Sequence, residues 1–202
     1  LRMASALPKQ YLPLAGKTVL EWAINPFLQD VSCKMVVVVI APDDQYWTQL
    51  ALALPKLQLA HGGAERVHSV LAGLQSLTDA EANDWVMVHD AARPCLFAED
   101  LDKLVAAAVN DDVGGILATP LADTLKQSNS GGCIENTVLR DYLWRALTPQ
   151  LFKIGMLKNA LQSALAKGLM VTDESSSLEA MGCHPKLVEG RSDNLKITVP
   201  SD

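Results

Sequence analysis

Hydrophobic and polar positions alternate along the first part of the chain with two different periods. Short aliphatic runs without polar interruption predict buried strands at 35–41, 56–60, 85–88 and 115–120. Segments with apolar residues every three to four positions predict helices at 18–28, 45–53, 67–77 and 99–109. This alternation indicates an α/β protein with a mostly parallel, twisted sheet and helices on both faces.

The pattern changes after Pro120. Residues 122–142 are mixed, small and polar around Ser128-Asn129-Ser130-Gly131-Gly132, which is typical of an exposed hairpin tip. A two-stranded hairpin is marginally stable alone, so we predict a protruding β-arm that packs against a second copy of the chain in a homodimer. Further elements are predicted as strands at 144–148, 187–190 and 195–198, and as helices at 154–167 and 173–181.

Several helix ends carry recognisable signals. Thr18 with Glu21 forms a capping box, Gly168 follows a helix as its C′ residue, and Asp173 could act as an N-cap. No repeat or linker divides the chain, so we expect one domain over 1–202 with an arm subregion at 122–142. The chain opens as if inside a loop and closes on a helix-start signal at Pro200-Ser201-Asp202, so we expect further residues on both sides.

Composition narrows the class of protein. The chain is 49% hydrophobic with a net charge of -6, and it has no basic run, which argues against a nucleic-acid or membrane surface. Its four cysteines form no Cys-x-x-Cys pair, so neither a zinc site nor a redox motif is indicated, and reduced thiols in the cytoplasm are expected. No apolar run approaches the ~20 residues that span a bilayer.

Polar chemistry begins abruptly after the predicted strand at 85–88. His89, Asp90 and Arg93 follow it, at the edge of the sheet where open α/β folds bind ligands. Asp90 could bind a ribose hydroxyl or hydrated Mg²⁺, and Arg93 could bind a phosphate with two hydrogen bonds. The alternative is a plain polar turn capped by Asp90, and for His89 a structural role is the more common one.

Three other groups could carry chemistry. Arg2 and Lys9 in the opening loop could neutralise a polyphosphate, although solvated surface cations are the simpler interpretation. Gly62 and Gly63 with Ser69 would allow close approach of a flat ligand, or form only a turn. Lys196 lies within an apolar run, where an unpaired charge is costly, so we expect it to have an anionic partner.

Six motifs taken together resemble the 2-C-methyl-D-erythritol 4-phosphate cytidylyltransferase family. They are Pro8-Lys9-Gln10-Tyr11, Gly62-Gly63-x-Glu65-Arg66-x-x-Ser69-Val70, Val88-His89-Asp90-Ala91-Ala92-Arg93-Pro94, Leu147-Thr148-Pro149-Gln150, Thr172-Asp173-Glu174 and Val188-Glu189-Gly190-Arg191-x-Asp193-Asn194-x-Lys196-Ile197-Thr198. The resemblance implies a Rossmann-like nucleotidyltransferase fold. It also implies transfer of a cytidylyl group from CTP to methylerythritol phosphate, with release of pyrophosphate.

The same resemblance implies roles for individual residues. Catalytic cations would be Arg2, Lys9 and Lys196, whereas Gly63, Ser69 and Asp90 would bind the nucleotide. Substrate-binding residues would be Asp90, Arg93 and Thr172, joined by Thr124 and Arg140 from the arm of the neighbouring subunit. Mg²⁺ is the implied cofactor, held mainly by the CTP phosphates and not by a protein metal site.

Two competing functions are compatible with the sequence. A related cytidylyltransferase acting on a pentitol phosphate such as ribitol 5-phosphate would share the CTP residues and differ in the arm. A nucleotide-binding protein without catalysis is the other alternative. The motifs favour the methylerythritol phosphate enzyme.

Overall fold

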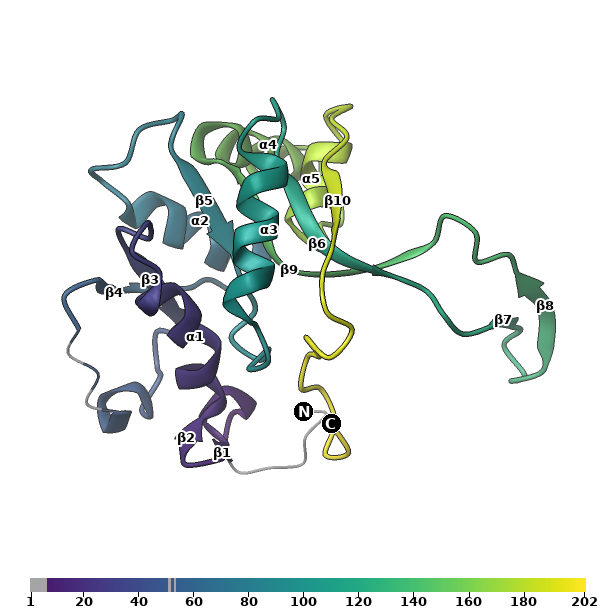
Figure 1. Ribbon diagram of the computed structural model, residues 1–202, viewed down its shortest axis with the longest axis horizontal. Coiled ribbons are helices and arrows are strands. Elements are labelled where there is room, and N and C mark those ends of the chain that lie inside the picture. Colours follow the sequence, from purple (N-terminus) through teal and green to yellow (C-terminus); the bar gives the residue numbers. More distant parts are fainter. Residues whose placement is uncertain (1–6, 51, 53) are drawn as a thin grey trace.

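The computed structural model describes residues 7–50, 52 and 54–202, which form an α/β body from which a long arm projects (Figure 1). The main sheet has the strand order β10-β6-β9-β5 and contains β5 (Trp85–Val88), β6 (Gly115–Pro120), β9 (Trp144–Lys153) and β10 (Lys186–Glu189). A second sheet pairs β3 (Val36–Ile40) with β4 (Leu57–His61) in parallel. The predicted α/β class is confirmed. The main sheet, predicted to be mostly parallel, is mixed, because β10 runs parallel to β6 whereas β9 runs antiparallel to β5 and β6.

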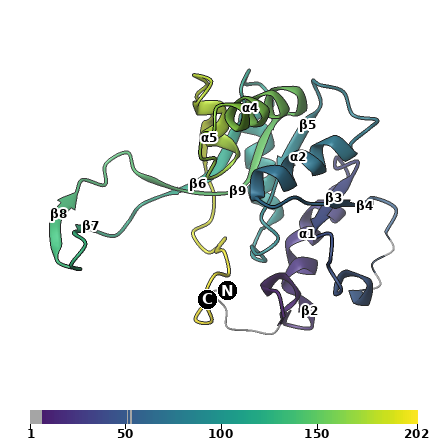
Figure 2. The same cartoon turned by 180° about the vertical axis from the view of Figure 1, so that it is seen from behind.

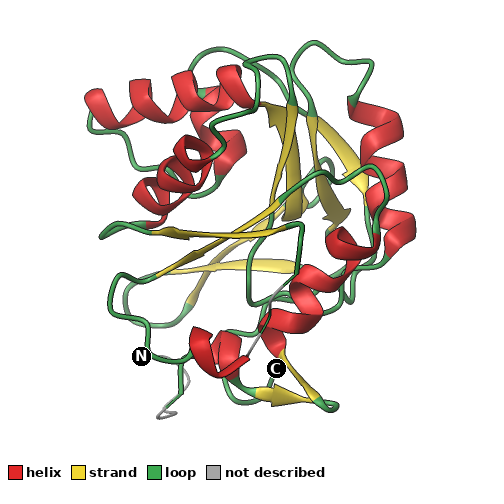
Figure 3. Cartoon of the chain, turned by 90° about the vertical axis from the view of Figure 1, so that its left-hand side faces the viewer, coloured by secondary structure: helices red, strands yellow, loops and turns green. Residues whose placement is uncertain are grey.

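Helices cover both faces of the main sheet, as predicted (Figure 3). They are α1 (Val19–Gln29), α2 (Arg66–Ser76), α3 (Ala98–Ala108), α4 (Ile154–Ala166) and α5 (Glu174–Glu179), with 3₁₀ turns η1 (Lys9–Tyr11) and η2 (Trp47–Leu50). Side chains of a strand alternate between faces. Accordingly, Ile116 and Ala118 of β6 pack with α2, α4 and α5, whereas Leu117 packs with α3.

Local capping chemistry sets several helix ends as the sequence predicts. The Thr18 hydroxyl accepts a hydrogen bond from Glu21 N, and Glu21 in turn accepts one from Thr18 N. Gly168 adopts a left-handed φ of 63° just after α4, which glycine tolerates without strain. Asp173 caps α5 by accepting a hydrogen bond from Ser176 N at 3.1 Å.

Three predicted elements differ from the structure. In place of the helix at 45–53, the described residues form only the turn η2, because one carboxylate oxygen of Asp44 accepts from both Tyr46 N and Trp47 N at 2.9 Å. The strand predicted at 144–148 continues to Lys153 through Pro149. The strand predicted at 195–198 is wrong: Leu195 N bonds Asp193 O in a tight turn, and no strand is assigned there.

The predicted hairpin at 122–142 is confirmed. Its strands β7 (Leu125–Ser128) and β8 (Ile134–Val138) pair antiparallel at the end of the arm, far from the body in both views (Figures 1 and 2). The Asn129 side chain accepts from Gly131 N and Cys133 N and so closes the turn between them. A small β1–β2 hairpin (Pro13–Leu14 and Lys17–Thr18) before α1 was not predicted.

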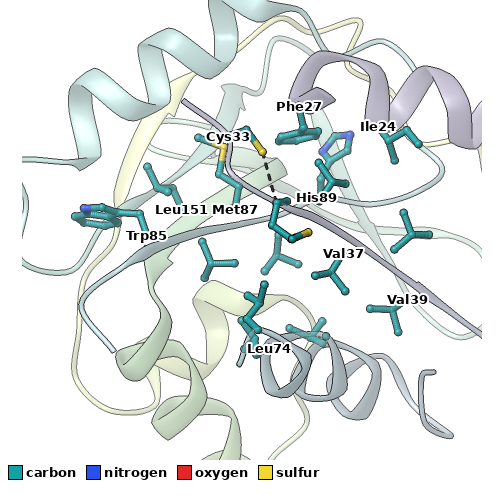
Figure 4. A pocket seen from close by; sticks show the side chains of 18 of the residues that line it. Ile24, Phe27, Cys33, Val37, Val39, Leu74, Trp85, Met87, His89 and Leu151 are labelled. Atoms are coloured by element: carbon teal, nitrogen blue, oxygen red, sulfur yellow. Dashed lines mark hydrogen bonds between the residues drawn. The ribbon is translucent and has the colours of Figure 1, made fainter. Parts of the chain in front are cut away.

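A cavity of about 680 Å³ separates the two sheets. Consecutive residues of β3 and β5 line it, together with Ile24 and Phe27 of α1 and Leu74 of α2 (Figure 4). Most of its lining is aliphatic or aromatic, so this cavity does not suit a charged phosphate group. Among the described residues, no helix is long and apolar enough to cross a membrane.

Candidate active site

Asp90 lies at the centre of a cluster of positive charges. Its Oδ2 is 3.0 Å from Lys196 Nζ and 3.3 Å from Arg93 Nε, and its Oδ1 is 3.6 Å from Arg66 Nη2. Burial alone would raise the pKa of Asp90, but Lys196 and the two guanidinium groups outweigh it, so the pKa falls below its ordinary value. Asp90 is therefore an ionised carboxylate that these cations share.

The strand end that carries Asp90 is fixed by Thr148 of β9. Asp90 N donates to Thr148 Oγ1 at 3.1 Å, and the same hydroxyl lies 2.9 Å from His89 Nδ1. His89 Nε2 lies 3.1 Å from the carbonyl oxygen of Arg93, which can only accept, so Nε2 carries the proton and Nδ1 accepts from Thr148. Both ring nitrogens are thus engaged within the protein, which assigns His89 a structural role.

The chain beyond β10 reaches the same place through Asn194. Arg93 Nη1 donates to Asn194 O at 2.7 Å, while Asn194 Nδ2 donates to Thr148 O at 2.8 Å. Ile197 N then bonds Ala92 O at 2.9 Å. This anchoring, and not a strand, carries Lys196 to Asp90, which supplies the anionic partner that the sequence predicted for this lysine.

Lys9 approaches this segment from the opposite end of the chain. Its Nζ donates to the carbonyl oxygen of Ile197, the neighbour of Lys196, at 3.0 Å. Two of the three predicted catalytic cations therefore lie near one another although they are far apart in the sequence. The third, Arg2, is outside the described residues.

A polar pocket of about 250 Å³ opens beside Asp90. It is lined by Arg66, Asp90, Arg93, Ala146, Leu147, Thr148, Gln150, Thr172, Asp173 and Lys196. The lining thus includes the predicted residues Asp90, Arg93, Thr172 and Lys196. With three cationic side chains and two carboxylates among these residues, the pocket suits an anionic ligand such as a phosphate.

The predicted nucleotide residues Gly63 and Ser69 lie together at the start of α2. Ser69 Oγ accepts from Gly63 N at 3.3 Å and donates to Glu65 O at 3.2 Å. A Cβ added at Gly63 would come within 2.5 Å of the His68 Cβ, so this tight turn requires glycine. Gly63 precedes Arg66, the first residue of α2, by three positions, and Arg66 lines the polar pocket.

The predicted arm residues are not in the pocket of their own chain. Thr124 immediately precedes β7 and Arg140 follows β8, and both are exposed on the projecting arm (Figure 1). The structure contains one copy of the chain, so contacts between subunits stay a prediction.

Several residues that line the pocket or support it from behind were not singled out from the sequence. Arg66 and Glu174 occur in the quoted motifs, but nothing in their local pattern shows that they form an ion pair 108 positions apart. Gln150 is buried in β9, where its amide donates to Asp173 Oδ2 at 2.8 Å and accepts from Ser175 N at 2.8 Å. The sequence signal that could have identified Gln150 is its position as a polar residue after Pro149, within an otherwise apolar segment.

The protein side chains could supply only a minor part of the ligands of a Mg²⁺ ion, most of which would come from bound phosphates. Among the described residues, no group of three or more His, Cys, Asp or Glu side chains could hold a metal. Both Asp173 oxygens already accept hydrogen bonds, from Ser176 N and from Gln150 Nε2. Asp90 is the pocket carboxylate that could exchange its cations for one bound to phosphates, and Mg²⁺ commonly binds one or two carboxylates plus substrate phosphates.

The fold and the pocket define an α/β protein with a cationic pocket at its strand ends, the place where open α/β folds bind their ligands. Residues 1–202 match the family model described as 2-C-methyl-D-erythritol 4-phosphate cytidylyltransferase. A curated relative of that name from Ectopseudomonas mendocina is 50% identical over 204 residues, covering 100% of this chain and 87% of the relative.

Solved structures agree with this match. A crystal structure of 4-diphosphocytidyl-2C-methyl-D-erythritol synthase has a TM-score of 0.87 and 41% identity, covering 96% of this chain and 90% of that one. The 2-C-methyl-D-erythritol 4-phosphate cytidylyltransferase of Francisella tularensis has a TM-score of 0.86 and 34% identity, covering 95% and 88%. The chain belongs to the 2-C-methyl-D-erythritol 4-phosphate cytidylyltransferase family, which confirms the resemblance drawn from the motifs.

The buried imidazole of His89 predicts a specific pH dependence of stability. Burial lowers the pKa of His89 from 6.5 to about 4, so as the pH falls through this window the unfolded chain takes up a proton that the folded chain does not. The free energy of unfolding should therefore decrease between pH 6.5 and 4. Each unit of difference in pKa is worth about 1.4 kcal/mol, so we expect this residue to account for roughly 2 to 3 kcal/mol of that loss.

Urea unfolding at pH 7 and pH 4.5 of the natural chain and the His89→Gln variant measures this contribution. The exposed His184→Gln variant is the matched control and should behave as the natural chain. Equal pH dependence in all three proteins would contradict the assignment.

Proposed function

We propose that this chain transfers a cytidylyl group from CTP to the phosphate of 2-C-methyl-D-erythritol 4-phosphate. The products are 4-diphosphocytidyl-2-C-methyl-D-erythritol and pyrophosphate. The observation that carries the proposal is the cluster of Arg66, Arg93 and Lys196 around Asp90, in a polar pocket of a chain that belongs to this family.

The reaction joins two anions. An oxygen of the acceptor phosphate forms a bond to the α-phosphorus of CTP while the bond from that phosphorus to the bridging oxygen breaks, and pyrophosphate leaves with the electron pair. The attacking phosphate already carries a lone pair, so no general base is required. Two unit charges at 4 Å repel by about 4 kcal/mol at an effective dielectric constant of 20, and this repulsion is what the protein must offset.

The cations of the pocket can supply that compensation. Lys196 and Arg93 are gathered at Asp90 within the pocket before substrate binds, so they are close at hand to turn toward an incoming phosphate. We assign the triphosphate to Lys9, Lys196 and Arg2, and cytosine to the Gly63 turn with Ser69. Arg93 and Thr172 would line the acceptor side, with Asp90 between the two ligands.

Mg²⁺ is the cofactor that we propose for this site. When bound, it would neutralise part of the triphosphate charge and draw electron density from the α-phosphorus. The CTP phosphates would provide most of its ligands, with Asp90 as the carboxylate in reach. The cationic side chains of the pocket would still position the phosphates for in-line attack.

We also propose a homodimer in which the arm completes the neighbouring pocket. Exposed apolar side chains along the arm support this, since Ile134, Leu139 and Tyr142 are 67%, 81% and 97% exposed. In this arrangement Thr124 and Arg140 would bind the acceptor phosphate in the partner's pocket.

The four free cysteines fit a reducing compartment, for which we propose the cytoplasm.

The choice of acceptor tests the proposed function directly. Pyrophosphate release should be rapid with CTP and 2-C-methyl-D-erythritol 4-phosphate, and at least about 100-fold slower with ribitol 5-phosphate, because a pocket shaped for one polyol loses hydrogen bonds with another. Preference for ribitol 5-phosphate would replace the proposed substrate. Binding of CTP without pyrophosphate release from either acceptor would indicate a nucleotide-binding protein.

Removing either central lysine should abolish most of the activity. We expect Lys196→Ala and Lys9→Ala to lower kcat by about 10² to 10³ or more, because each loses a cation that offsets charge in the transition state. Circular dichroism should show an intact fold. Lys103→Ala, which removes a cation bound to Asp100 outside the pocket, is the matched control. Near-normal rates in the two pocket variants would refute their roles.

Mixing two inactive variants tests whether the arm acts across subunits. Arg140→Ala damages the arm and Lys196→Ala damages the body, so a mixed dimer regains one site with both residues intact. Random exchange should restore roughly a quarter of the natural activity, since half of the dimers are mixed and each has one complete site. A monomer in sedimentation at micromolar concentration, or no recovery after verified exchange, would contradict the arrangement.

A further inference from the structure

Arg66, which lines the polar pocket, forms an ion pair with Glu174, which lies buried directly after the lining residues Thr172 and Asp173. Arg66 is the first residue of α2, close to the Gly62-Gly63 turn, and Glu174 is the first residue of α5, next to Thr172 and Asp173. The two guanidinium nitrogens Nη1 and Nη2 bond the two carboxylate oxygens, the latter pair at 2.8 Å. The geometry is the planar, two-bond pairing that fixes the orientation of an arginine.

The carboxylate end of this pair is rigid. The Glu174 side chain is 0% exposed, and α5 is held to β9 because Gln150 accepts from Ser175 N and donates to Asp173. Burial raises the pKa of Glu174, whereas the hydrogen bonds and charge of Arg66 oppose that rise. A buried carboxylate of this kind is costly unless its partner stays in place.

The guanidinium end faces the pocket. The Arg66 side chain is 35% exposed, lines the polar pocket and has Nη2 3.6 Å from Asp90 Oδ1. Burial lowers the pKa of Arg66, but the bonds and charge of Glu174 more than offset this, so the group stays charged. Among the described residues, Lys196 and Arg93 form ion pairs with Asp90 alone, whereas Arg66 also pairs with Glu174 and so has its own fixed support.

We propose that Glu174 is a positioning residue that locks Arg66 as a fixed positive charge on the pocket wall, between the nucleotide turn and the acceptor side. This inference rests on the proposed function, because it assumes that phosphates occupy the pocket. Lys196 and Arg93 can turn from Asp90 to an incoming phosphate, whereas Arg66 keeps its orientation. A charge held in advance stabilises a transition state more than one that must reorient.

Three variants separate positioning from a purely structural role. Glu174→Gln removes the buried charge at nearly constant shape, Arg66→Met removes the cation, and the double variant removes both members of the pair. We expect Glu174→Gln to lower kcat about 10- to 100-fold while KM for each substrate changes less than about threefold, because the lost interaction belongs to the transition state.

The double variant gives the decisive comparison. It leaves no unpaired buried charge, so its thermal unfolding temperature should recover relative to Arg66→Met. Its kcat should nevertheless stay as low as that of Arg66→Met alone, because Glu174 acts only through Arg66. Arg66→Lys, which keeps the charge without the two-bond geometry, should recover part of the rate.

The outcomes are distinguishable from failure of the proposed function. Pyrophosphate release by the natural chain with both substrates tests that function, and the variants are scored only against this rate. Lys186→Met, which breaks the ion pair with Asp111 outside the pocket, should leave kcat unchanged. Recovery of kcat together with stability in the double variant, or an unchanged kcat in Glu174→Gln, would overturn the positioning role.

Discussion

The negative charge of Asp90 brings together three cations from distant parts of the chain. Arg66 begins α2, Arg93 follows β5, and Lys196 lies in the segment beyond β10. Asp90 is largely removed from water, whereas Arg66 and Lys196 are 35% and 40% exposed, so desolvation and solvent screening make this cluster weak as a source of stability. Its arrangement is better explained by function, because it keeps cations close together without an external anion and leaves them available to one.

The remaining architecture serves to hold that cluster. β9 supplies Thr148, which fixes the backbone of Asp90 and, through Asn194, the segment that carries Lys196. The side chain of Glu174 orients Arg66, and α5 is itself held by Gln150 of the same strand. One antiparallel strand thus supports both the Asp90 cluster and α5, which explains why polar residues occur within a buried element.

Sequence patterns predicted the elements whose chemistry is local. The capping box at Thr18, the aliphatic run of β3 and the glycine after α4 depend on neighbouring residues, and the structure confirms them. Patterns failed where distant contacts decide. The continuation of β9 was missed because Pro149 and Gln150 are unusual inside a buried strand, and the hydrogen-bond partners of the Gln150 side chain come from α5 and its N-cap. Residues 195–198 alternate like a strand, but contacts with Ala92 and Asp90 fix their conformation. The same limit concealed the pairing of Arg66 with Glu174.

Asp90 is the organiser of the cations, and the single-turnover rate of Asp90→Asn at saturating CTP and acceptor tests this role directly. The substitution preserves the shape of the side chain and removes its charge. We expect a rate roughly 100-fold below that of the natural chain, with CTP still bound in calorimetry, because the cations lose their common anchor. A rate within about threefold of the natural chain would contradict it.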